Sequence, residues 1–148
     1  TACVFGAGAW DTHRHNFITL RELLPSLDQS LSALITDLDE RGLLQDVAVV
    51  MGGEFGRTPR IGDATPDGRS HWPEAGFLWV AGGGLKTGQI IGATDAHGEQ
   101  VVGTPIRMQN VLATLYRLLG IDPATTFPDY NGRPQYLLEN RRPVAGLL

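Results

Sequence analysis

The longest regular pattern in the sequence runs from Phe17 to Arg41 and has the spacing of an α-helix. Asn16 is a suitable N-cap for this helix, and Gly42 stands in the position of a C-terminal cap. Pro25 interrupts the pattern and is expected to kink the helix or split it in two. The apolar side chains form one broad stripe, which predicts an amphipathic helix lying on a sheet: Leu20, Leu23, Leu24, Leu27, Leu31, Leu34, Ile35 and Leu38.

Short apolar runs on either side of this stretch have the length of β-strands. The run from Val47 to Met51 does not alternate, which is typical of a strand buried on both faces in a parallel sheet. Further strands are expected at residues 2–5, 77–81 and 89–93, the last of them nearer an edge. A second helix is expected to have Pro105 in its first turn and to end at Gly120. This order of strands and helices predicts a layered α/β domain.

The chain of 148 residues has the usual size of a single domain. It begins without methionine, directly in a strand-like apolar run, which predicts the C-terminal part of a larger domain. Residues 60–75 are rich in Gly, Pro, Asp and Arg and are expected to form a long irregular loop of a functional or mobile kind. Residues 121–148 are rich in Pro, Arg and Asn and are expected to form a tail that wraps around the domain.

Composition excludes some classes of function. A net charge of −4 and an isoelectric point near 5.4 argue against binding of nucleic acid through a broad basic surface. The single cysteine, Cys3, excludes an internal disulfide and a cysteine-rich zinc site. No apolar run is long enough to span a bilayer, so no transmembrane segment is expected.

Polar loops that follow the expected strands carry the candidate functional residues. Such loops lie at the sheet edge where α/β proteins bind ligands. The first loop contains Asp11, His13 and His15, whose carboxylate and imidazoles can converge on a divalent cation. The same residues would also suit a solvated loop in which the aspartate caps the next helix.

A second loop, Gly52 to Pro59, presents Glu54 between glycines that allow a sharp turn. Arg57 in this loop could hold an anionic substrate through its planar fork of donors, or could pair with Glu54 for structural reasons only. A third loop contains His71, which could be a metal ligand, a general acid or base, or a packed residue.

The rest of the sequence gives no further catalytic candidates. Residues 95–99 read as a polar turn between structural elements. The sequence has no phosphate-binding loop, no Cys–His arrangement and no Gly-x-Ser-x-Gly motif, so a serine triad has no visible nucleophile.

The loop motifs together resemble the bacterial domain-of-unknown-function family 1501. The resemblance covers nearly all of the chain, but only the C-terminal part of the family's length. Each short piece is weak by itself, whereas the combination in this order is specific. The pieces are Trp10-Asp11-Thr12-His13 with Asn16-Phe17, Gly53-Glu54-Phe55-Gly56-Arg57-Thr58-Pro59, His71-Trp72-Pro73, Leu119-Gly120-Ile121-Asp122-Pro123 and Gly132-Arg133-Pro134.

That family looks like a branch of the alkaline phosphatase and sulfatase superfamily. The resemblance implies the C-terminal portion of a three-layer α/β/α sandwich of the alkaline-phosphatase-like type, with one or two metal ions at the strand ends. It matches Asp11 and His13 to the first metal-binding loop, Glu54 to the position of an Asp-His pair, and His71 to a later lone histidine.

The sequence departs from the superfamily pattern at two positions. Phe55 stands where the histidine of the Asp-His pair is expected, so one ordinary ligand is missing. His15 stands where the family motif commonly has Asn, and it is a candidate additional ligand. The resemblance places the Ser or Thr nucleophile upstream of this chain.

The resemblance implies a metal-dependent hydrolase of phosphate or sulfate esters. Asp11, His13, Glu54 and His71 would hold one or two divalent ions, namely zinc, calcium, magnesium or manganese. Arg57 would grip the nonbridging oxygens of a small anionic ester. The alternative is a catalytically degenerate protein of the same fold that binds a metal, an anion or a carbohydrate. In either case the resemblance implies export to the periplasm.

Overall fold

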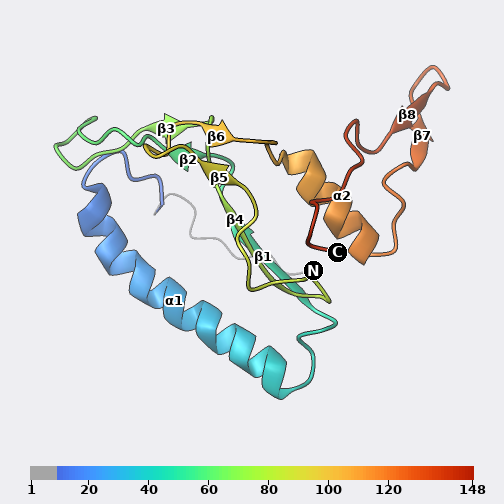
Figure 1. The fold of residues 1–148 in the computed structure, drawn as a ribbon, viewed down its shortest axis with the longest axis horizontal. Helices are drawn as coiled ribbons and strands as arrows, with labels where there is room; N and C mark the ends of the chain where they lie inside the picture. The colour runs from blue at the N-terminus through green and yellow to red at the C-terminus, as the bar shows by residue number, and fades with distance from the viewer. Residues whose placement is uncertain (1–9) are drawn as a thin grey trace.

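The computed structural model describes residues 10–148, so the strand expected at residues 2–5 lies outside the described part of the chain. The described residues form two helices and four antiparallel pairs of short strands (Figure 1). Each pair is a ribbon of two strands only. No helix within residues 10–148 is long and apolar enough to cross a membrane.

Helix α1, Asn16–Glu40, is the long helix that the apolar stripe predicts. Pro25 lies inside this single helix, so of the two expected effects, a kink or a split, the split does not occur. A proline lacks the N–H that would bond to the carbonyl four residues earlier, but that loss does not end a helix whose other turns are hydrogen-bonded. The apolar stripe is only partly covered, because Leu24 and Leu34 remain 47% and 43% exposed.

The two ends of α1 differ in how well the sequence predicts them. The N-cap is His15, in the left-handed region at φ 51°, whereas Asn16 is already helical and buried. The expected cap at Asn16 is therefore wrong by one residue. At the other end Gly42 has φ 69°, and the N–H of Leu43 donates to the carbonyl of Leu38 at 2.8 Å. This glycine-dependent ending is confirmed.

Strands β1, Ala48–Gly52, and β4, Leu78–Gly82, form the central ribbon, with Val50 opposite Val80. They run antiparallel, and β1 alternates between exposed and half-buried residues. The expectation that this strand is buried on both faces of a parallel sheet is therefore wrong for the described residues. A parallel pair needs a crossover connection, usually helical, whereas residues 53–77 contain no helix and return the chain beside β1.

The excursion between β1 and β4 contains a second ribbon. Strand β2, Gly56–Arg57, pairs with β3, His71–Trp72, and this register places Arg57 opposite His71. Gly56 is required here, because a Cβ at this position would lie 2.0 Å from the carbonyl oxygen of Ala75. The segment expected to be irregular, residues 60–75, thus contains one short strand, β3.

A third ribbon joins β5, Ala93–Thr94, to β6, Val101–Val102. The strand expected at residues 89–93 is wrong, since Ile90 is 95% exposed and only the last residue of that range is extended in a ladder. The polar turn between β5 and β6 is confirmed. The Asp95 carboxylate accepts hydrogen bonds from the N–H groups of His97, Glu99 and Gln100, and these bonds, chiefly that from Glu99, lower the pKa of Asp95.

Helix α2, Met108–Leu118, begins after Pro105 rather than including it, and ends before Gly120 at φ 72°. The segment that follows contains the ribbon of β7, Thr126–Pro128, and β8, Pro134–Tyr136.

The last residues then return to α2 and to the loop after β4. The N–H of Val144 donates to the Thr114 hydroxyl at 2.9 Å, and Lys86 N–H donates to the carbonyl of Leu147 at 2.9 Å. Both partners of the first contact are buried, so the end of the chain is anchored on one face of α2.

Gly82, the last residue of β4, provides a test of how tightly the end of the central ribbon is packed. Gly82 and Gly88 have similar positive φ angles of 68° and 75°, but a Cβ on Gly82 would meet the carbonyl oxygen of Val47 at 2.3 Å, whereas Gly88 has open space. We expect Gly88→Ala to lower the free energy of unfolding by about 1–2 kcal/mol. We expect Gly82→Ala to cost about 1–3 kcal/mol more because of the clash. Denaturant unfolding of the intact protein measures both, and equal losses would contradict this account.

Candidate metal centre

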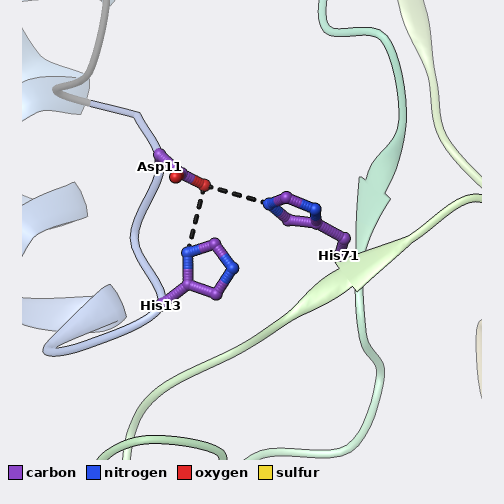
Figure 2. A group of neighbouring side chains, drawn as sticks. All are labelled: Asp11, His13 and His71. Carbon is purple, nitrogen blue, oxygen red and sulfur yellow. Dashed lines mark hydrogen bonds and ion pairs between the residues drawn. The ribbon is translucent and has the colours of Figure 1, made fainter.

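Three side chains from two distant segments meet beside the start of α1 (Figure 2). Asp11 and His13 belong to the loop that precedes the helix, and His71 belongs to β3. The Asp11 Oδ1 atom lies 3.1 Å from His13 Nδ1 and 3.2 Å from His71 Nε2. One ligand atom from each residue lies within 4.8 Å of the other two. The three grouped side chains come from the first and third of the loops that the sequence singled out.

The loop before α1 is shaped by its own hydrogen bonds. The N–H of Thr12 donates to the carbonyl of Trp10, and that of His13 donates to the carbonyl of Asp11, both at 3.0 Å. The buried Thr12 hydroxyl donates to Asn16 Oδ1 at 2.5 Å. Because Thr12 is held inward against the first residue of the helix, Asp11 and His13 on either side of it turn toward β3.

Arg57 completes the cluster. Its Nη2 donates to Asp11 Oδ1 at 2.6 Å and to the carbonyl of Trp10 at 3.1 Å, and its Nη1 donates to the carbonyl of Arg69 at 3.4 Å. The hydrogen bond from Arg57, and then that from His71, lower the pKa of Asp11 below its ordinary value. Asp11 is therefore a carboxylate at neutral pH, and its Oδ1 atom accepts hydrogen bonds from Arg57 and His71, while His13 Nδ1 lies 3.1 Å away.

The excursion after β2 is tied to the same loop. The N–H of His15 donates to the Thr65 hydroxyl at 3.0 Å, and that hydroxyl donates to Asp67 at 2.9 Å. The Gly68 backbone lies so close to the carbonyl of His13 that a Cβ would come within 2.3 Å of its oxygen. Residues 60–70 therefore hold the backbone of the first loop in place.

The strand β3 is held on its other side as well. Trp72, the residue after His71, donates from Nε1 to the carbonyl of Glu99 at 2.8 Å. Phe55 lies against the His71 ring, with centroids 4.3 Å apart and the planes tilted by 39°. The His71 ring is thus supported by a neighbouring aromatic ring while its Nε2 faces Asp11.

The remaining predicted site residues lie elsewhere. Glu54 is exposed and is not one of the three grouped side chains. His15 faces Asp67, with Nδ1 3.8 Å from Oδ1, rather than Asp11. The sequence did not reveal the supporting roles of Thr12 and Thr65. The spacing of four residues between Thr12 and Asn16 was a usable signal for the first, but nothing local links Thr65 to His15.

The chemistry of the three grouped side chains suits a divalent cation. Two imidazole nitrogens and one carboxylate oxygen form a mixed donor set that zinc and related transition metals accept. Calcium and magnesium prefer sites built from oxygen alone. The Asp11 and His71 side chains are 57% and 46% exposed, so further ligands can approach from solvent.

A mixed α and antiparallel β domain with a histidine–carboxylate cluster is what the described residues define. The family model described as "Protein of unknown function (DUF1501)" matches residues 3–148. The chain therefore belongs to this family, and the resemblance drawn from the loop motifs is confirmed. Neither a curated protein nor a solved structure matches the chain.

Thr65 allows the support of the site to be tested apart from its chemistry. Thr65→Val removes the acceptor for the N–H of His15 and the donor to Asp67, while leaving the three clustered residues unchanged. We expect the amide of His15 and those of residues 60–70 to exchange with solvent about tenfold faster, as for a local opening made easier by one hydrogen bond. The exposed Thr87, changed to Val, is the matched control. Unchanged exchange at His15 would show that this contact does not hold the loop.

Proposed function

We propose that Asp11, His13 and His71 bind one divalent transition-metal ion, with zinc the best match to the donors. The supporting observation is that one ligand atom from each of these residues lies within 4.8 Å of the other two. Catalytic zinc sites characteristically use three protein ligands and keep a further position open, whereas structural sites use four. A three-residue set that is open to solvent fits the catalytic kind.

We further propose that the protein hydrolyses phosphate or sulfate esters. When bound, such an ion supplies a Lewis acid and lowers the pKa of an attached nucleophile. Arg57 lies next to the ligand Asp11 and brings a planar, permanently charged group to the same place. Guanidinium groups bind the oxygens of phosphoryl and sulfuryl groups in pairs. A cation site beside an arginine is therefore suited to a tetrahedral oxyanion.

The proposal extends to the fold. We propose that the described elements form part of a larger α/β/α sandwich of the alkaline-phosphatase-like type. The partly exposed stripe of α1 and the two-stranded central ribbon support this view, because both leave apolar surface and strand edges that a larger sheet would cover.

One observation favours a second candidate, a binding protein without turnover. Phe55 stands at the position where the resemblance expects a histidine ligand, and its ring lies against His71. With an apolar ring there, the site keeps metal and anion binding but has fewer ligands to align a nucleophile. This candidate shares the cation site and differs only in catalysis.

Metal analysis of the intact protein tests the cation site. We expect one zinc ion per chain in the wild type after equilibration with zinc, and loss of stoichiometric metal in His13→Ala and in His71→Ala. Glu54→Ala is expected to keep the ion, because Glu54 lies outside the grouped side chains. His97→Ala, which changes an exposed histidine in the turn after β5, is the matched control. A wild type without stoichiometric zinc would refute both candidates.

Turnover of aryl phosphates and aryl sulfates separates the two candidates. We expect kcat/KM for one of these esters to fall by about 100-fold or more in the double variant His13→Ala/His71→Ala, the size of effect seen when one charge-stabilising group is lost. His97→Ala should retain the wild-type value. If the zinc-loaded wild type is no faster than the double variant, the binding protein is the better description.

A further inference from the structure

Three side chains place a nitrogen next to the Asp11 Oδ1 atom, and they differ in what they can do when a cation is bound. A carboxylate only accepts hydrogen bonds, so His71 Nε2 carries the hydrogen of its bond to Asp11, and His13 Nδ1 lies 3.1 Å from the same oxygen (Figure 2). A neutral imidazole can move its hydrogen to the other ring nitrogen and present a lone pair instead. An imidazole can therefore become a metal ligand at this place.

Arg57 cannot make this change. Its guanidinium has only N–H donors and no lone pair to offer to a metal. It lies 2.6 Å from the same carboxylate oxygen that a cation would use. Arg57 is therefore the one member of the cluster that competes with a cation for Asp11.

The structure also prevents Arg57 from simply moving away. Its side chain is 21% exposed, and it donates to the backbone carbonyls of Trp10 and Arg69 as well as to Asp11. These anchors hold a positive charge beside the cation site. With both histidines neutral, a divalent ion, one carboxylate and one guanidinium leave an excess of two positive charges. An anion with two negative charges is the group that balances this excess.

We infer that this site binds its cation and a dianionic tetrahedral oxyanion cooperatively, and that Arg57 couples the two. The inference rests on the proposed cation site and names the class of anion that belongs with it. Without the anion, Arg57 weakens cation binding by repulsion and by competing for Asp11. With the anion present, the N–H groups of Arg57 that do not reach Asp11, Trp10 or Arg69 donate to its oxygens, and the repulsion is screened.

The charge balance also distinguishes two classes of ester. A phosphate monoester carries close to two negative charges above neutral pH, whereas a sulfate monoester carries one. The excess of two positive charges therefore selects phosphate monoesters over sulfate monoesters. Carbohydrates without a charged group leave the excess unbalanced.

The coupling is measured by zinc affinity, so the test does not depend on turnover. The intact protein is titrated with zinc against a competing chelator at about pH 8, where phosphate is chiefly dianionic, with and without inorganic phosphate. We expect phosphate to tighten zinc binding by about tenfold, well within the 5- to 150-fold range usual for coupled sites. Methyl sulfate, a monoanion, should tighten it less. By reciprocity, zinc should tighten phosphate binding by the same factor.

The direction in which Arg57→Met changes the zinc affinity is the decisive result. In the absence of phosphate, we expect this variant to bind zinc about two- to fivefold more tightly than the wild type, because a partly screened like charge has been removed. In this variant, phosphate should not tighten zinc binding beyond the change seen in buffer controls. Arg60→Met, which removes an exposed arginine three residues after Arg57, should bind zinc as the wild type does and keep the response to phosphate.

The outcomes separate this inference from the proposed function. If wild-type zinc affinity is the same with and without phosphate, the coupling is refuted while the cation site stands, and this arm needs no variant to fold. If Arg57→Met binds zinc more weakly without phosphate, Arg57 only positions Asp11 and the inference is wrong. If the wild type binds no zinc, the proposed function fails and the coupling fails with it.

Discussion

The ion pair between Asp11 Oδ1 and Arg57 Nη2 joins the loop before α1 to the ribbon of β2 and β3. The other links between these two segments are the hydrogen bonds from His71 to Asp11 and from Arg57 to the carbonyl of Trp10. The same oxygen also orients both histidines, so one carboxylate sets the geometry of the whole cluster. Because the pair is partly exposed, it mainly orients the side chains of the cluster and adds little to stability. The buried hydrogen bond from Thr12 to Asn16 holds the loop rigid.

The short ladder of β2 and β3 is equally important for the site. It contains only two residue pairs, and one of them places Arg57 opposite His71. Successive residues of a strand face opposite sides, so a slip by one residue would replace His71 with Trp72 at this position. The hydrogen bonds from Arg69 to the carbonyls of Thr58 and Arg57 help to fix the register next to the ladder.

Periodic and local signals were sufficient to predict part of the fold. The stripe from Leu20 to Leu38 predicted α1, and the glycines at 42 and 120 marked the ends of both helices correctly. The central strands were found within one residue of their bounds. The antiparallel pairing of β1 with β4 was missed, because an unbroken apolar run does not reveal whether the next strand arrives through a helix or through a returning loop.

The candidate site was predicted by residue type more successfully than by geometry. Asp11, His13, His71 and Arg57 do meet, but Glu54 and His15 do not join the grouped side chains. Each of these two is the immediate or near neighbour of a cluster residue in sequence. Which side a loop side chain faces depends on the left-handed turn at His15 and on the ladder at Gly56, and neither is visible in motif spacing.

The hydrogen bond from Trp72 to the carbonyl of Glu99 gives the turn after β5 a part in the site that its own residues do not suggest. Trp72 and His71 point to opposite sides of β3, so one face of the strand contacts Asp11 and the other contacts the turn. The bond uses a backbone carbonyl, and the turn is itself shaped by backbone N–H groups around Asp95. Relatives could therefore vary most side chains of this turn and still keep the imidazole aimed at the carboxylate, provided that Asp95 and the length of the turn are retained.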